Sequence, residues 1–323
     1  MKVNFNIQNI NPSFKSYIKL NQETNLSVAT SFYHDLETLK KAVEIIENNF
    51  PDGADVLVYA GSNGEEAISI LSMFKNPEKY GIYSIDICSE AIEYANRGIY
   101  SVHSAAKDGF LVDNNENFSA DEQMAKNNFS KVVTKIEEPP FKLNNITDPI
   151  YYLRYGEEKC YTEKFYELNP SVRKKIKFVE GDIRDIKTFK TEKPVGGIFF
   201  RNALYHLTNN DLSGVFTYGD EPDKETNKLE VLQSLVNDVD EKLAPNGIFV
   251  LGNHTQEHLY IADKYTPADN KVPCGDNIEL MTVPPHLVAF DRNGHFKKCY
   301  EGDIKLSDYM SMKMPLIWQK CSL

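Results

Sequence analysis

The sequence lacks several features that would place it in a particular class of protein. Its five cysteines are scattered and none forms a Cys-x-x-Cys pair, which argues against a disulfide framework and a zinc knuckle. No apolar run reaches the 18 residues that a transmembrane helix needs, and the first residues lack the apolar core of a signal peptide. We therefore expect a cytoplasmic protein with no membrane partner and no metal site.

Positive charge is also scarce. Lys and Arg total 36 against 47 Asp and Glu, so the formal net charge is -11 at pH 7. Proteins that bind a nucleic-acid backbone normally carry a dense basic patch, and the longest basic cluster here is Arg173-Lys174-Lys175 with Lys177. We expect no nucleic-acid partner, and the sequence leaves the oligomeric state open.

What the sequence does contain is a regular alternation of apolar runs and helical patterns. Each apolar run is short, as in strands buried on both faces, and most are followed by a segment with helical spacing. This alternation predicts an α/β fold with a doubly wound, mostly parallel sheet. The predicted strands cover 55–60, 80–86, 175–179, 195–200, 248–252 and 315–318, and the predicted helices cover 36–46, 65–74, 90–97 and 229–243.

Two segments interrupt the alternation. Residues 101–170 are rich in Asn, Glu, Asp and Lys, and we interpret them as an insertion that forms a lid or a small subdomain. Residues 255–285 form a second, loop-rich excursion. After it, residues 287–296 are expected to form a hairpin, because Asn293-Gly294 favours a tight turn.

The expected domain organisation is simple. Residues 1–35 are an N-terminal extension that ends in a lead-in segment, residues 24–35. Residues 36–323 form one domain that carries both interruptions. No internal repeat and no linker between domains is evident.

Ligands bind doubly wound sheets outside the carboxyl ends of the strands, so the residues that follow each strand are candidates. The turn Gly61-Ser62-Asn63-Gly64 follows the first strand, and glycine allows the backbone to approach a ligand closely. Asp86 ends the second strand, where an acid accepts hydrogen bonds from ribose hydroxyls. Asp182 and Ile183 follow the third strand, and they offer an acceptor for an adenine amino group and an apolar face for its ring.

The glycine turn continues directly into negative charge, because Glu65 and Glu66 open the next helix. A pyrophosphate would meet this charge unfavourably, whereas a cationic sulfonium amino acid would not. The loop therefore favours S-adenosylmethionine over NAD. Arg201 and Asn202 follow the fourth strand at the same edge. Each residue alone is compatible with an ordinary turn or cap, and it is their order at successive strand ends that indicates a cofactor site.

Several of these segments resemble the CheR-type chemoreceptor glutamate methyltransferases. Residues 62–70 resemble the glycine loop and first helix of that family, and the resemblance continues through 84–87 and 95–100. Phe200-Arg201-Asn202 is similar to the family's cysteine-arginine-asparagine strand end. Further similar segments are 24–27, 30–35, 245–247 and 252–254.

The resemblance implies a class I methyltransferase fold of Rossmann-like type that uses S-adenosylmethionine and releases S-adenosylhomocysteine. It implies that Ala60, Gly61 and Glu65 hold the methionine end, Asp86 the ribose, Asp182 and Ile183 the adenine, and Asn202 the amino-acid part. Ser62, Gly64, Ile87 and Arg201 complete the expected cofactor site.

The sequence departs from the family at two positions. His34 stands where the family's lead-in segment carries an arginine near the methyl-transfer centre, and His206 stands where it has a tyrosine, with Tyr205 beside it. Histidines can orient a nucleophile or accept its proton near neutral pH, so His34, Tyr205 and His206 are the candidate catalytic residues. The family also has a basic helical N-terminal domain, which we expect this chain to lack.

Three functions are compatible with these observations. The first is methyl transfer to a protein carboxylate, as in glutamate O-methylation. The second is methyl transfer to a small molecule, with the 101–170 insertion as a lid. The third is a non-catalytic sensor or scaffold that binds S-adenosylmethionine or S-adenosylhomocysteine, which the substituted His34 and His206 keep open.

Overall fold

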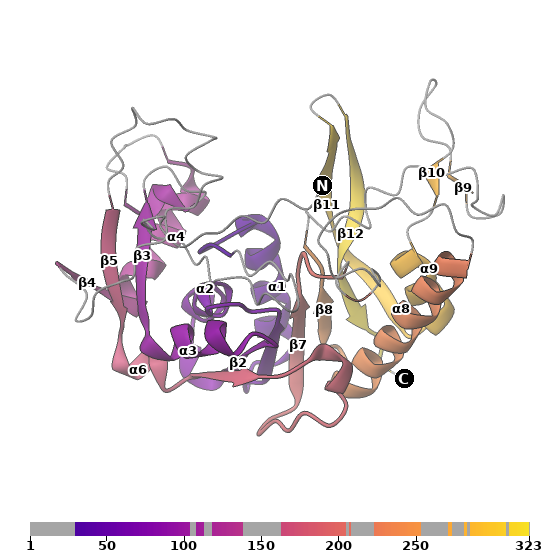
Figure 1. The fold of residues 1–323 in the computed structure, drawn as a ribbon, viewed down its shortest axis with the longest axis horizontal. Coiled ribbons are helices and arrows are strands. Elements are labelled where there is room, and N and C mark those ends of the chain that lie inside the picture. Colours follow the sequence, from indigo (N-terminus) through magenta and orange to yellow (C-terminus); the bar gives the residue numbers. More distant parts are fainter. Residues whose placement is uncertain are drawn as a thin grey trace, which may run out of the picture.

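The computed structural model describes residues 30–103, 108–112, 118–137, 163–204, 207, 223–252, 271–272, 281–282, 285–307 and 310–322. Its main element is a seven-stranded sheet in the order β11-β12-β8-β7-β1-β2-β6 (Figure 1). The strands are β1 (Asp55–Tyr59), β2 (Gly81–Asp86), β6 (Ile176–Glu180), β7 (Val195–Phe200), β8 (Ile248–Val250), β11 (Phe296–Ser307) and β12 (Met310–Lys320).

Most neighbouring strands of this sheet run parallel. β1 pairs in parallel with β2 and with β7, and the parallel pairing extends to β6 on one side and to β8 on the other. Only β12 runs in the opposite direction, since it is antiparallel to both of its neighbours, β8 and β11. The predicted architecture is therefore confirmed: an α/β fold with a mostly parallel, doubly wound sheet.

Helices cover both faces of the sheet, because successive strand residues point to opposite sides. Val56 and Val58 face a core shared with α1 and α2, whereas Leu57 and Tyr59 face a core shared with α8 and α9. The α-helices are α1 (Leu36–Asn49), α2 (Glu65–Met73), α3 (Ser89–Arg97), α4 (Ala120–Val132), α6 (Pro170–Arg173), α8 (Asp223–Lys242) and α9 (Pro285–Asn293), and the 3-10 helices are η1 (Pro77–Lys79), η2 (Gly109–Leu111) and η3 (Ile183–Asp185).

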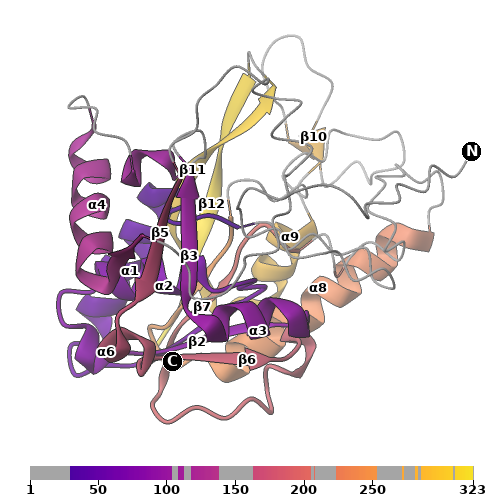
Figure 2. The same ribbon diagram turned by 60° about the vertical axis from the view of Figure 1, so that its left-hand side comes forward.

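A second, three-stranded sheet follows α3 in the chain. It is antiparallel, with the order β3-β5-β4, and it lies beside the main sheet, with α4 next to it (Figures 1 and 2). Its strands are β3 (Ile99–His103), β4 (Val133–Ile136) and β5 (Glu163–Leu168). We call β3, η2, α4, β4 and β5 the inserted unit. Helix α4 packs against α1 and α2, so the inserted unit is attached to the main domain through helices.

One local prediction is wrong. Residues 287–296 do not form a hairpin, since α9 occupies Pro285–Asn293. Phe290 is 1% exposed and stacks on Trp318 with 4.1 Å between the ring centroids, which holds the helix against the sheet. Gly294 has a φ of 73°, the left-handed conformation that commonly ends helices. Asn293-Gly294 therefore ends a helix instead of turning a hairpin.

The short strands β9 (Lys271–Val272) and β10 (Met281–Thr282) pair antiparallel within the segment expected to be loop-rich. In the described part of the chain, no helix has the length and apolar character needed to cross a bilayer.

Candidate functional site

The glycine turn lies at the carboxyl edge of the sheet, directly after β1. The backbone amide of Gly61 donates to the carbonyl of Ile85 at 3.0 Å, which draws the turn onto β2. A Cβ atom on Gly61 would lie 2.5 Å from Ser84 Oγ, so only glycine fits this close approach. Gly64 has a φ of 91° and precedes the first residue of α2, and a Cβ there would overlap the ring of Phe178. Packing and conformation thus both require the predicted glycines.

Asp86 fixes the turn from the end of β2. Its carboxylate accepts hydrogen bonds from the backbone amides of Ser62 at 2.8 Å and Cys88 at 2.9 Å, and the residue is 6% exposed. Burial raises the pKa of the Asp86 carboxyl, and hydrogen bonds from the amides of Cys88, Ser62 and Ile87 offset part of the rise. Asp86, the residue predicted to bind the ribose, therefore contacts the predicted glycine turn directly.

Ile87 follows Asp86 with its side chain in solvent. It is 46% exposed, which is unusual for a large apolar residue in this structure. An uncovered apolar side chain beside a buried carboxylate is a surface on which an aromatic ring can lie. Ala60, on the other side of the turn, is also exposed and has a φ of 53°.

The pair after β6 is placed differently. Asp182 accepts from the backbone amide and from Nε of Arg184, both at 2.9 Å. Partial burial raises the pKa of Asp182, but the hydrogen bonds and charge of Arg184 outweigh it and the net shift is downward. Ile183 is 4% exposed within the core on the α8 side of the sheet. Their contacts with adenine stay a prediction, and Ile183 has little surface free for such a contact.

Arg201 is the centre of a buried ion-pair cluster. Its guanidinium group donates from Nη1 to Glu66 Oε2 at 2.8 Å, and from Nη2 to the His34 carbonyl at 2.9 Å and to Asp35 Oδ2 at 3.3 Å. The side chain of Arg201 is 1% exposed, and those of Asp35 and Glu66 are 9% and 13% exposed. We call Asp35, Glu66 and Arg201 the Arg201 cluster.

The Arg201 cluster has one cation for two carboxylates. Burial raises the pKa of Glu66, the Arg201 charge lowers it, and the Asp35 charge raises it again, with a net upward shift. Arg201 Nε is buried and has no hydrogen-bond partner among the described residues. When all three groups are ionised, the cluster therefore leaves an excess negative charge behind the glycine turn. The sequence analysis did not identify Asp35 and Glu66 as candidate site residues, and their proximity to Arg201 was not predicted.

Asn202 turns the chain away from the end of β7. Its φ is 56°, and a Cβ on Gly252 would overlap its side-chain oxygen. The ends of β7 and β8 are thus in close contact at the same edge. Of the three candidate catalytic residues, His34 is half-buried at this edge, while Tyr205 and His206 lie outside the described residues.

The described end of the lead-in segment is attached at several points. The amide of Phe32 donates to Asp108 at 3.2 Å, and the amide of Tyr33 donates to Ser69 Oγ at 2.9 Å. The hydroxyl of Tyr33 lies 2.7 Å from Ser72 Oγ. These contacts hold residues 32–33 between α2 and the inserted unit, directly before His34.

Left-handed backbone conformations concentrate at this edge. Six non-glycine residues in the described chain have a positive φ, and all except Asn246 belong to it: Tyr33, Asp35, Ala60, Ser62 and Asn202. Such conformations cost of order 1–3 kcal/mol each and persist only where neighbouring contacts enforce them, which is frequent at functional sites. The carboxyl edge is therefore both strained and held in place.

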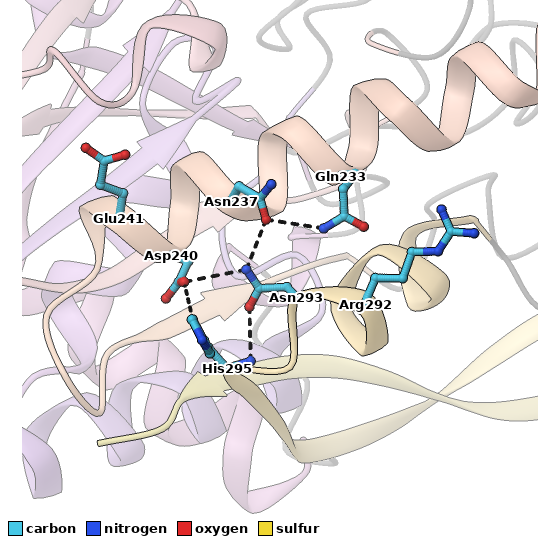
Figure 3. A pocket seen from close by; sticks show the side chains of 7 residues that line it. All are labelled: Gln233, Asn237, Asp240, Glu241, Arg292, Asn293 and His295. Atoms are coloured by element: carbon cyan, nitrogen blue, oxygen red, sulfur yellow. Dashed lines mark hydrogen bonds and ion pairs between the residues drawn. The ribbon is translucent and has the colours of Figure 1, made fainter. Parts of the chain in front are cut away.

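A polar surface hollow lies at the opposite, amino edge (Figure 3). It is lined by residues of α8 and by Arg292, Asn293 and His295. Asp240 Oδ2 lies 2.7 Å from His295 Nδ1 and 3.5 Å from Asn293 Nδ2, and Asp240 Oδ1 lies 3.2 Å from Lys320 Nζ. We call Asp240, Asn293, His295 and Lys320 the Asp240 cluster. It joins the end of α8 to β11 and β12 and is remote from the predicted cofactor residues.

No protein-family model matches the chain, and no curated protein sequence matches it. Solved structures with a similar arrangement include an S-adenosylmethionine-dependent methyltransferase from Methanosarcina mazei (13% identity, 86% of this chain and 97% of that chain, TM-score 0.35). Others are a magnesium protoporphyrin IX methyltransferase from Synechocystis (10%, 88% and 79%, 0.37) and an amino pentose methyltransferase from Micromonospora echinaspora (9%, 90% and 92%, 0.37). These TM-scores are below 0.5, so the function proposed below rests on the chain's own geometry.

Proposed function

We propose that the chain is an S-adenosylmethionine-dependent methyltransferase. The observation that carries the proposal is the excess negative charge behind the glycine turn, where Arg201 is one cation against the carboxylates of Glu66 and Asp35. The sulfonium of S-adenosylmethionine is a cation, and a buried site strengthens its attraction to this charge. The pyrophosphate of a dinucleotide would be repelled by the same charge.

The remaining candidate residues are assigned to the parts of this cofactor as follows. Asp86 is proposed to accept hydrogen bonds from the ribose, and Ile87 to contact the adenine ring, because it has apolar surface to offer. Asp182 and Ile183 are proposed on the adenine side. The turn residues Ala60, Gly61, Ser62, Gly64 and Glu65 are proposed to hold the methionine end, together with Asn202.

The cluster residue Arg201 is proposed to support the cofactor site from behind. All of its described hydrogen bonds go to Glu66, Asp35 and the His34 carbonyl, so it fixes the start of α2 and the lead-in segment relative to β7. Arg201 would then contribute to cofactor binding indirectly, by positioning these groups.

The proposed acceptor is a protein glutamate, as the resemblance to the CheR-type family implies. When bound, the cofactor supplies a methyl group already activated by positive sulfur. A carboxylate acceptor is ionised at neutral pH and needs no base, so the protein's contribution is mainly orientation. His34, Tyr205 and His206 are proposed to orient this acceptor.

A small-molecule acceptor is the second candidate, and the inserted unit favours it. This unit holds Phe32 through Asp108, two residues before His34, so it is attached next to the proposed acceptor side. We propose that residues 101–170 form a subdomain over a small acceptor in that case, and an acceptor with a hydroxyl or amine would require His34 or His206 as a base.

Calorimetry with S-adenosylmethionine, S-adenosylhomocysteine and NAD tests the cofactor. We expect the first two to bind and NAD to be rejected. Asp86→Ala removes a buried carboxylate and is expected to weaken S-adenosylmethionine by about tenfold or more, since hydrogen bonds to charged groups are worth about 1.5–3 kcal/mol. Asp240→Asn, at the opposite edge, is the matched control and should bind normally. A folded wild-type protein that does not bind S-adenosylmethionine would contradict the proposal.

Incubation with a cell extract and a cofactor labelled in the methyl group tests the acceptor. Label on protein as a base-labile ester supports the glutamate acceptor, and label on a small molecule supports the second candidate. Cofactor binding without any transfer of label would instead indicate a non-catalytic sensor or scaffold.

A further inference from the structure

Tyr100 joins the inserted unit to the glycine turn. It is the second residue of β3 and is 1% exposed. Its hydroxyl donates to the backbone carbonyl of Asn63 at 3.0 Å, and Asn63 is itself 1% exposed at the tip of the turn. A side chain from outside the main sheet thus fixes the backbone of the proposed cofactor loop.

The direction of this hydrogen bond follows from chemistry. A carbonyl can only accept, so the tyrosine must keep its proton. Burial, and then the negative charge of Glu65, raise the pKa of Tyr100 well above its ordinary value. The hydroxyl is therefore a permanent donor to the turn throughout the physiological pH range.

The ring of Tyr100 also contacts the lead-in segment. It packs edge-on against Phe32 with 5.5 Å between the ring centroids, and Phe32 packs against Phe129 of α4 at 4.8 Å. Because the Phe32 amide is bonded to Asp108, Phe32 is enclosed by the inserted unit. One side chain, Tyr100, consequently touches both the glycine turn and the segment that carries His34.

The turn depends on such contacts. Ala60 and Ser62 hold left-handed conformations, with φ values of 53° and 49°, that neighbouring bonds must enforce. Ser62 is held by Asp86 of β2 and the turn tip by Tyr100 of β3. The turn is therefore fastened on one side by the main sheet and on the other by the inserted unit.

We propose that Tyr100 is a positioning residue that couples the inserted unit to binding of the methyl donor. This inference rests on the proposed function. The inserted unit then acts as part of the cofactor site, so that a change in its position, such as closure on an acceptor, changes the affinity for S-adenosylmethionine.

The test compares Tyr100→Phe with Tyr166→Phe. Tyr166 of β5 is the direct cross-strand partner of Tyr100 and is also a buried residue, so each variant removes one tyrosine hydroxyl from the same face of the inserted sheet, and only the hydroxyl of Tyr100 is bonded to the turn. We expect Tyr100→Phe to weaken S-adenosylmethionine about fivefold in calorimetry, which corresponds to about 1 kcal/mol for a hydrogen bond. Tyr166→Phe should bind as the wild type does, even where both variants lower the melting temperature equally. Equal affinity of Tyr100→Phe and wild type would overturn the proposal.

A second measurement needs no variant. Coupling between sites is reciprocal, so S-adenosylmethionine added to the wild-type protein should slow hydrogen exchange in β3 as well as in residues 60–66. Protection that stops at the turn and leaves β3 unchanged would contradict the coupling. Failure of the wild type to bind at all is a different result, which removes the proposed function and is seen before any variant is measured.

Discussion

Buried carboxylates have opposite pKa shifts at the amino and carboxyl edges of the main sheet. In the Asp240 cluster one carboxylate faces Lys320, His295 and Asn293. Burial raises the pKa of Asp240, but these partners outweigh it and the net shift is downward. In the Arg201 cluster two carboxylates share one guanidinium, and the pKa of Glu66 is shifted upward.

This difference is what we expect between a structural cluster and the proposed cofactor site. In the Asp240 cluster the single carboxylate faces a lysine, and these contacts join α8 to β11 and β12. The Arg201 cluster is short of positive charge, and the strained turn of Ala60 and Ser62 lies beside it. On the proposed function, a cationic ligand would supply the charge that the Arg201 cluster lacks, and the Asp240 cluster has no such need.

The largest effect is expected from removing the cation that the described residues provide in the Arg201 cluster. Arg201→Met leaves Glu66 and Asp35 buried without a counter-charge, and breaking a buried ion pair in this way costs about 3–5 kcal/mol. Urea unfolding should therefore show a large loss of stability. Arg184→Met, which removes an exposed arginine paired with Asp182, should change stability little.

Adding Glu66→Gln to Arg201→Met sharpens the result. If excess negative charge causes the loss, the double variant should be more stable than Arg201→Met alone. A double variant as unstable as the sum of both changes would show that packing, not charge, is responsible.

The Arg201 cluster also shows where prediction from sequence ends. The strand over 195–200 was predicted with its observed bounds. The turn after β1 was located from its glycines, and Asp86 from its place at the end of an apolar run, because the spacing of apolar residues and glycines is a local signal. The contact of Arg201 with Glu66 spans 135 residues, and no local pattern encodes which charges meet.

The sequence also did not indicate which of two isoleucines, Ile87 or Ile183, is buried in the core. Ile183 follows a strand as a ligand contact would, yet it packs into the core, while Ile87 is the exposed one. The bond from Tyr100 to Asn63 depends on how the inserted unit docks, which composition does not determine. Asn293-Gly294 fits a hairpin and a helix end equally well, and tertiary packing of Phe290 on Trp318 decided between them.

A smaller effect is expected at the amino edge. Asp240→Asn removes a carboxylate that receives charged hydrogen bonds, and each such bond is worth about 1.5–3 kcal/mol. The pKa of Asp240 is depressed in the folded protein, so its stabilisation is present above the unfolded pKa of about 3.9 and is lost as pH falls through the folded pKa. Urea unfolding at pH 7 should distinguish the variant from wild type, and the difference should disappear in acid.

Asp303→Asn is the control for this change, because Asp303 forms an exposed pair with Lys313 and such pairs contribute little. A difference between Asp240→Asn and wild type that grows in acid would contradict the assignment of Asp240 as an ionised, well-paired group.

The smallest effect, and the most specific to function, is expected for Glu66→Gln. It removes one of the two carboxylates of the Arg201 cluster, so the preference for the sulfonium of S-adenosylmethionine over the neutral sulfur of S-adenosylhomocysteine should fall about tenfold, or about 1.4 kcal/mol. Calorimetry with both ligands measures this ratio.

The pH dependence of stability has the opposite sign for Glu66 and for Asp240, because folding raises the pKa of Glu66. The unliganded wild type should therefore lose stability relative to the Glu66→Gln variant as the pH rises from the unfolded pKa, about 4.3, toward the folded pKa. Bound S-adenosylmethionine should reduce that loss, since it supplies the positive charge that the cluster lacks. An unchanged ratio of the two affinities would mean that the excess charge does not act on the sulfonium, and the two edges of the sheet would then differ in stability alone.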